Sequence, residues 1–221
     1  FQTPTVFTME LAHTRAVEAV ALSSDGVLVA TGSRDQLARL WRAHDGAIVG
    51  EPMQHDRPIT ALAFSPDDTL LATGTVGGVV RLWSVATQRP MSDELHHGDD
   101  VVGAVVFSTS GRYMATLSQS SLRVWHVEMG RPYGRAMQHG GAVSAGAISF
   151  TRDEAALIAV SSEGHVTRWP IAAVPGSLEE LRLRTWAALG IRLDEQGAAS
   201  PIPWQEWRDL RDRLDQTALT Q

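Results

Sequence analysis

The sequence contains no cysteine and no lysine, and it has no long apolar run. Without cysteine there can be no disulfide framework and no thiolate metal site. No apolar segment reaches the length of a membrane-spanning helix, and the start of the chain does not resemble a signal peptide. The net charge of −6 argues against binding of nucleic acid through neutralisation of its phosphates. We therefore expect a cytoplasmic protein that binds neither nucleic acid nor membranes.

Arginine supplies all nineteen basic residues, which we interpret as the compositional bias of a GC-rich bacterial genome. The chain begins with Phe1 rather than methionine, so we expect it to be a piece of a longer protein.

A repeat of about 42 residues dominates the chain. Each unit opens with a histidine and closes with a tryptophan, at His13 and Trp41, His55 and Trp83, His97 and Trp125, and His139 and Trp169. A period of 40 to 45 residues with turns inside the unit is typical of a four-stranded propeller blade. The sequence therefore predicts an all-β propeller segment over residues 1–170, with blades that start near residues 13, 55, 97 and 139.

The second repeat shows the expected strands. They are Ile59–Phe64, Leu70–Thr73, Val79–Trp83 and Met91–Leu95. The inner strand is apolar on both faces, as a strand covered on both sides requires. The third and fourth inner strands have one and two extra residues, which predicts β-bulges in both. Residues 1–12 match the end of a repeat, so 6–12 are expected to form the outer strand of an incomplete blade.

These motifs resemble the WD40-repeat family of β-propellers. The family pattern is Gly-His, an inner strand, Ser-Pro-Asp-Gly, a second strand with Ser or Thr, a turn Asp, and Trp-Asp. Here the glycine before the histidine and the aspartate after the tryptophan are replaced in every repeat, while the other signals remain over residues 1–170.

The resemblance implies a hydrogen-bonded set of side chains that braces each blade: the histidine, a second-strand hydroxyl, a turn acid and the tryptophan. The residues in these positions are His13, Thr31 (or Ser33), Asp35 and Trp41; His55, Thr73 and Trp83; His97, Thr116 and Trp125; and His139, Ser161, Glu163 and Trp169. Gly77 replaces the acid in the second blade, and the third has none. The first blade is therefore expected to be the best braced.

Nothing in the motifs predicts catalysis, a metal or a cofactor. The four leading histidines lie one to a blade and cannot converge on one ion. His96 and His97 are adjacent, and adjacent residues of an extended chain point to opposite sides. No P-loop, nucleophile elbow or zinc-protease motif occurs.

Residues 171–221 differ in character and predict a helical tail. Ser177 caps a helix that is expected to end near Leu189, and Pro203 opens a second that runs to about Leu214. Residues 191–201 are expected to be a short extended piece and a loop. The tail loosely resembles the end of WD-repeat regions in large bacterial signalling proteins that carry kinase or NTPase modules.

The predicted function is a non-catalytic protein-interaction scaffold or sensor module of a bacterial signalling protein. Loop residues at one end of the blades are the candidate contacts for a protein or peptide partner: Arg15, Arg34, Arg57, Val76 and Asp99. The alternatives are a hydrolase or lyase propeller with an axial site, and a purely structural spacer.

Four blades are fewer than a ring of this family usually has. Either upstream blades of a longer protein complete the ring, which we favour, or two copies form an eight-bladed ring. An uncovered strand edge is a template for pairing, so one of these outcomes is needed.

Overall fold

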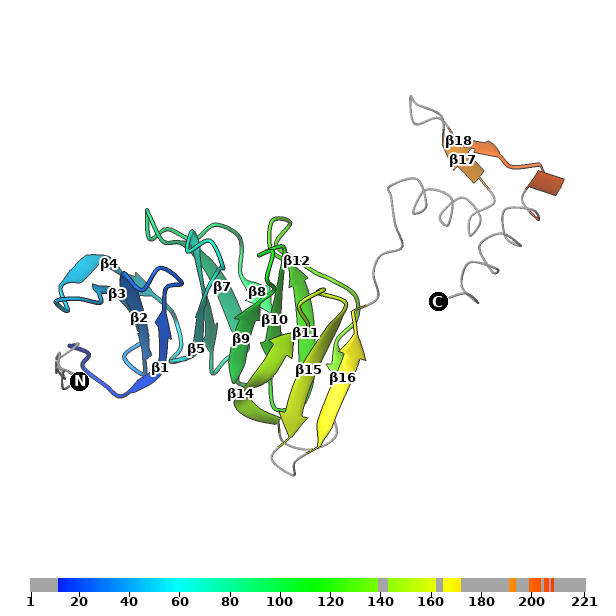
Figure 1. Ribbon diagram of the computed structural model, residues 1–221. Coiled ribbons are helices and arrows are strands. Elements are labelled where there is room, and N and C mark those ends of the chain that lie inside the picture. Colours follow the sequence, from blue (N-terminus) through cyan, green and yellow to red (C-terminus); the bar gives the residue numbers. More distant parts are fainter. Residues whose placement is uncertain are drawn as a thin grey trace, which may run out of the picture. The chain divides into compact units, whose positions relative to one another are not determined.

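The computed structural model describes residues 12–138, 143–161, 165–171, 191–193, 199–203, 205, 206 and 208. The chain divides into two compact units, residues 1–171 and residues 172–221. The first unit contains four antiparallel sheets that follow one another in sequence order, from β1 at one end to β16 at the other (Figure 1). Each sheet corresponds to one predicted repeat, so the propeller-type all-β fold is confirmed.

Blades 1 and 2 each have four strands in simple order. Blade 1 consists of β1 (Val17–Leu22), β2 (Leu28–Ser33), β3 (Leu37–Arg42) and β4 (Ile48–Gln54). Blade 2 consists of β5 (Ile59–Phe64), β6 (Leu70–Thr75), β7 (Val79–Ser84) and β8 (Leu95–His96).

Blade 3 has an outer edge made of two short strands, β12 and β13, which both pair with β11. Its strands are β9 (Ala104–Phe107), β10 (Tyr113–Leu117), β11 (Ser121–His126), β12 (Arg131–Pro132) and β13 (Met137–Gln138). Among the described residues, blade 4 has three strands: β14 (Val143–Phe150), β15 (Ala156–Ser161) and β16 (Val166–Pro170).

The turn between the first two strands of a blade has a recurring geometry. In blade 1 the Ser23 hydroxyl donates to Asp25 Oδ1 at 2.6 Å, and the same oxygen accepts the Val27 amide at 2.8 Å. The residue after this aspartate has a positive φ and is Gly26 in blade 1 and Asp68 in blade 2. Glycine and aspartate both tolerate this left-handed conformation, so the sequence places the turn.

The core lies between neighbouring blades. Three clusters of buried apolar residues join blades 1 and 2, blades 2 and 3, and blades 3 and 4. Small residues in the second strand let the blades approach closely, since a Cβ on Gly32 would lie 2.5 Å from Ile59 Cγ2 of the next blade. Leu40 and Leu82, which are equivalent by repeat, are both almost fully buried in these contacts.

The structure confirms one local prediction and corrects two others. Register shifts occur in β1, β5 and β14, so the bulge predicted in the fourth inner strand is confirmed. The bulge predicted in the third is wrong, because β9 pairs with β10 without a shift and begins only at Ala104. The predicted strand Met91–Leu95 is also wrong in extent. Apart from a bridge between Trp83 and Pro90, pairing resumes only at Leu95–His96.

The second unit is described only in part. It contains a two-stranded antiparallel sheet of β17 (Ile191–Leu193) and β18 (Ala199–Pro201), where an extended piece and loop were expected. Gln205, Glu206 and Arg208 are helical. Apart from residue 12, the outer strand expected over residues 6–12 lies outside the described residues, as do the helix expected over 177–189 and most of the second helix.

Candidate functional site

The brace of blade 1 joins all four predicted side chains. The Trp41 indole donates to the Thr31 hydroxyl at 2.7 Å, and His13 Nε2 lies 2.7 Å from the same oxygen. His13 Nδ1 donates to Asp35 at 3.0 Å. Arg39 also donates to Asp35 at 3.0 Å; the Asp35 side chain is almost fully removed from solvent, and Arg39 is half-buried.

The environment of Asp35 favours its charged form strongly. Burial alone would raise the pKa of this carboxyl, but hydrogen bonds from Arg39, His13 and two backbone amides outweigh burial and hold its pKa well below the usual range. Ser33, the alternative hydroxyl, instead donates to the backbone carbonyl of Arg15 at 3.0 Å. Its position therefore lies beside the brace rather than in it.

Blade 2 keeps the tryptophan, threonine and histidine but supports them differently. His55 Nε2 lies 2.7 Å from the Thr73 hydroxyl, which accepts the Trp83 indole N–H at 3.0 Å. His55 Nδ1 donates to the Met53 carbonyl at 3.0 Å rather than to an acid. Burial lowers the pKa of His55 from 6.5 to about 4, so this ring is neutral at neutral pH.

Glu94 supplies the acid that Gly77 cannot. It binds Arg81, the repeat equivalent of Arg39, from the outer edge of the blade. Asp56 lies 3.6 Å from the same guanidinium. The sequence prediction missed this ion pair, although the 42-residue spacing of Arg39, Arg81 and Arg123 was a signal that could have found the arginines.

Blade 3 uses the histidine ring in the opposite orientation. His97 Nδ1 lies 2.6 Å from the Thr116 hydroxyl, which also accepts the Trp125 indole N–H at 2.8 Å. His97 Nε2 lies 3.1 Å from both the carbonyl and the hydroxyl of Ser121. A serine turn therefore replaces the acid. Among the described residues, the buried Nε of Arg123 has no hydrogen-bond partner.

Blade 4 departs furthest from the pattern. Strand pairing places Ala159 opposite Thr167, where Thr31 and Thr73 pair with Arg39 and Arg81 in the first two blades. In this blade the position that Thr31 and Thr73 occupy in the first two blades is therefore an alanine. Ser161 lies two residues further along β15 and pairs with Val143. His139 and Glu163 lie outside the described residues, and Trp169 is half-buried.

The five candidate partner contacts lie at the histidine end of blades 1 to 3, as the positions of their loops require. Arg15, Arg34, Arg57 and Asp99 are exposed, and Val76 is half-buried. Arg34 is engaged in an ion pair with Glu18 of the same blade. Among the described residues no hydrogen bond or ion pair forms with the side chains of Arg15 and Arg57, so these two are available to a partner.

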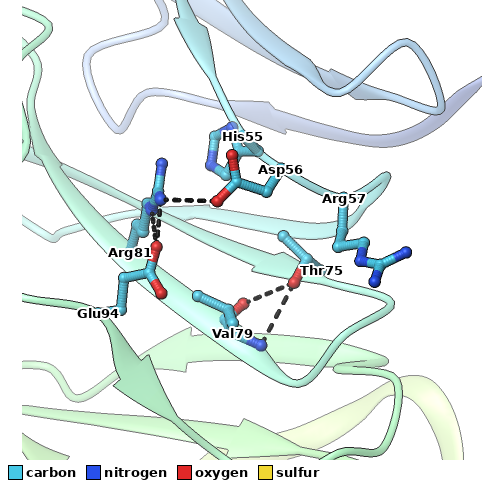
Figure 2. Close-up of a pocket in the computed structure, with 7 residues that line it drawn as sticks. All are labelled: His55, Asp56, Arg57, Thr75, Val79, Arg81 and Glu94. Carbon is cyan, nitrogen blue, oxygen red and sulfur yellow. Dashed lines mark hydrogen bonds and ion pairs between the residues drawn. The ribbon is translucent and has the colours of Figure 1, made fainter.

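A small hollow lies at this end of blade 2, lined by His55, Asp56, Arg57, Thr75, Val79, Arg81 and Glu94 (Figure 2). Its volume of about 20 Å³ admits a water-sized group. Pockets for small-molecule ligands are typically some 300 to 1,000 Å³. In Figure 2 Arg57 points away from the Arg81–Glu94 pair, at the rim of the hollow. This arrangement suits a surface contact rather than the enclosure of a substrate.

In the described part of the chain, no group of three His, Asp or Glu residues is close enough to hold a metal ion. The described residues also include no helix with the length and apolar character needed to cross a bilayer. The predictions of no metal, no cofactor and no catalysis stay predictions.

Comparison with known proteins places the fold. The crystal structure of the computationally designed Ika4 protein matches with a TM-score of 0.63 and 22% identity, over 75% of this chain and all of that one. At this identity the likeness shows the fold alone. No curated protein matches the chain. A family model described as "Nucleolar protein 10-like, N-terminal domain" matches residues 8–167, well over half of the sequence. The chain therefore belongs to this family of β-propeller domains.

Proposed function

We propose that this chain is a non-catalytic protein-interaction module of a bacterial signalling protein, located in the cytoplasm. The observation that supports it most is the histidine end of blades 1 and 2. There Arg15 and Arg57 are exposed without a described ion-pair partner, and the hollow that Arg57 lines is too small for a substrate. Arginine is enriched where proteins meet, because its guanidinium binds carboxylates in a bidentate geometry.

Charge reversal tests this proposal. The variant Arg15→Glu, Arg34→Glu, Arg57→Glu should lose the partner proteins that the immobilised chain retains. The matched control is Arg42→Glu, Arg89→Glu, Arg131→Glu, which reverses three exposed arginines at the opposite end of the blades. If both variants retain the partner proteins equally, the histidine end of the blades is not the partner-binding face.

The two alternatives make different predictions. An axial enzyme needs acids or histidines on the inner strands, yet β1, β5 and β9 carry Glu18 as their only acid, and it is paired with Arg34. A pure spacer would retain no protein through either end of the blades.

A second proposal concerns the outer face of blade 1. Val17, Val20 and Leu22 of β1 are 41%, 64% and 60% exposed. Their repeat equivalents in blade 2 pack on blade 1, where Ile59, the equivalent of Val17, is fully buried. The exposed side of β1 therefore has the composition of a blade-packing face with no described blade against it.

Blade 4, at the opposite end of the series of blades, also has an exposed apolar face. Val166 of β16 is 67% exposed, whereas Val80 and Leu122, which occupy the same pairing position in blades 2 and 3, are fully buried. We propose that another blade of the same type covers each end face. A second copy that closes an eight-bladed ring is the version that can be tested directly.

Light scattering on a sizing column gives the test. A dimer that becomes monomeric in Val20→Asp, Leu22→Asp, but not in the exposed-turn control Val27→Asp, would support closure by a second copy. A folded monomer would overturn it and would assign the covering blades to a longer parent protein.

A further inference from the structure

A larger hollow lies between blades 2 and 3, at the end of the blades opposite to Arg15 and Arg57. Its volume is about 460 Å³, within the range of ligand-binding pockets. It is lined by Thr69, Leu70, Leu82, Met91, Ser92, Ser110, Gly111, Arg112, His126, Val127 and Glu128. Leu82 is buried at its base, and Met91 is 60% exposed at its edge.

The equivalent place between blades 1 and 2 is filled by the chain itself. Gln88, in the turn that follows β7, reaches across to blade 1, where its side-chain amide donates to the Val49 carbonyl at 2.7 Å. Its side chain lies against Gly50, so closely that a Cβ on Gly50 would be 2.2 Å from Gln88 Oε1. A glutamine from one blade and a glycine from its neighbour thus lock this groove.

Between blades 2 and 3 the glutamine and the glycine of this contact are both replaced. The repeat equivalent of Gln88 is Gly130, and that of Gly50 is Ser92. Gln88 and Gly130 share the same left-handed backbone, with φ of 54° and 58°. Met91 is the equivalent of Val49, and it lies opposite Leu82 as Val49 lies opposite Leu40. The backbone is therefore conserved in shape, but the side chain that crosses the groove is absent.

We propose that this hollow is a binding site for a peptide segment that inserts a glutamine side chain. The glutamine would repeat from outside what Gln88 does from inside: its stem would pack on Leu82, Val127 and Met91, and its amide would donate to the Met91 carbonyl. An unbranched stem that ends in an N–H donor fits an apolar base with a polar rim. Arg112 and Glu128, both exposed on that rim, would contact the flanking backbone.

Methyl NMR of the full chain with labelled methionine tests the proposal. The chain has six methionines, and Met91 can be assigned by its loss in Met91→Leu. The probe is N-acetylglutamine N-methylamide. The Met91 methyl signal should shift saturably at concentrations on the order of millimolar. Blocked norvaline, which has the same stem without the donor, should bind about tenfold more weakly. Met129, exposed but outside the lining, should not shift.

Two variants complete the test. Ser92→Gly, Gly130→Gln transfers the glutamine lock to this groove and should abolish the shift. Ser92→Leu fills the hollow from its wall and should do the same if the double variant fails to fold. The proposal is overturned if Met91 does not respond to the glutamine probe, or if its response survives in a folded filling variant. Because the probe is a small molecule at the opposite end of the blades, this outcome is independent of the charge-reversal test.

Discussion

Blades 1 and 2 hold the same tryptophan–threonine–histidine chain by different means. In blade 1 an acid in the turn, Asp35, receives hydrogen bonds from both His13 and Arg39. In blade 2 that position is Gly77, and the two tasks are separated. A backbone carbonyl accepts from His55, and Glu94 pairs with Arg81. The buried contacts are retained because unsatisfied buried polar groups are costly, whereas the acid can come from another segment of the blade.

The comparison also separates a buried charge from a half-exposed one. The Asp35 side chain is 3% exposed, whereas that of Glu94 is 35% exposed. A buried ion pair is damaging to break, because the remaining charge is left without water or partner. An exposed pair contributes little, since solvent replaces what is lost.

The largest effect is expected from Asp35→Ala. It leaves the half-buried Arg39 and the His13 ring without their acceptor and should lower the free energy of unfolding by about 3 kcal/mol. Urea denaturation followed by tryptophan fluorescence measures it. Asp45→Ala, which removes a surface partner of Arg42, is the control and should change little. An equal loss in both variants would refute a special role for the turn acid.

His55 should make the stability of the protein depend on acid. Its folded pKa of about 4 lies below the unfolded value of 6.5, so protons favour the unfolded state. Above pH 6.5 His55 is neutral in both states and the free energy of unfolding is unaffected by its titration. As the pH falls from 6.5 to 4, the free energy of unfolding decreases by about 3 kcal/mol at most. Denaturation curves across this range measure it. In His55→Gln the same interval should show a correspondingly smaller slope, and an unchanged slope would assign the effect elsewhere.

A smaller effect is expected from Glu94→Gln in blade 2. The variant keeps the shape and removes the charge that pairs with Arg81, so the free energy of unfolding should fall by about 1 kcal/mol. Raising the salt concentration should shrink the difference between variant and wild type, because this pair is partly exposed. A loss as large as that of Asp35→Ala would mean that the burial of an ion pair does not determine how much its removal destabilises the protein.

The regular part of this fold could be predicted because it is periodic. The spacing of histidine and tryptophan predicted four blades, and the strand pattern of the second repeat placed β5 to β7 within a few residues. The bulge expected in β9 was wrong because the extra residue enters the loop before the strand. Length alone cannot decide between a loop and a bulge, since both absorb one residue.

The contacts made across strands and across blades could not be predicted from the sequence. Glu94 replaces an acid that is distant from it in the sequence, and only strand pairing brings it to Arg81. The alanine of blade 4, by contrast, could have been found from the sequence, because Ala159 lies ten residues before Trp169, as Thr31 lies before Trp41 and Thr73 before Trp83. The groove between blades 2 and 3 depends on the residue types at positions 92 and 130, Ser92 and Gly130, which belong to different blades.

In blade 3 the equivalent arginine, Arg123, has no acid beside it among the described residues. The prediction here concerns whether a substitution raises or lowers the free energy of unfolding. Arg123 Nε is buried without a hydrogen-bond partner in the described part of the chain, and a buried donor in this state costs about 1 to 3 kcal/mol. Arg123→Met keeps the packing of the stem and removes that cost, so the free energy of unfolding should rise by up to about 1 kcal/mol. Arg39→Met in blade 1 removes a partner of Asp35 and should lower it. The same substitution at equivalent positions should therefore change stability in opposite directions, as chemical denaturation of the two variants would show. If both substitutions destabilise the protein, Arg123 has an acceptor in solution and the blade 3 brace is complete after all.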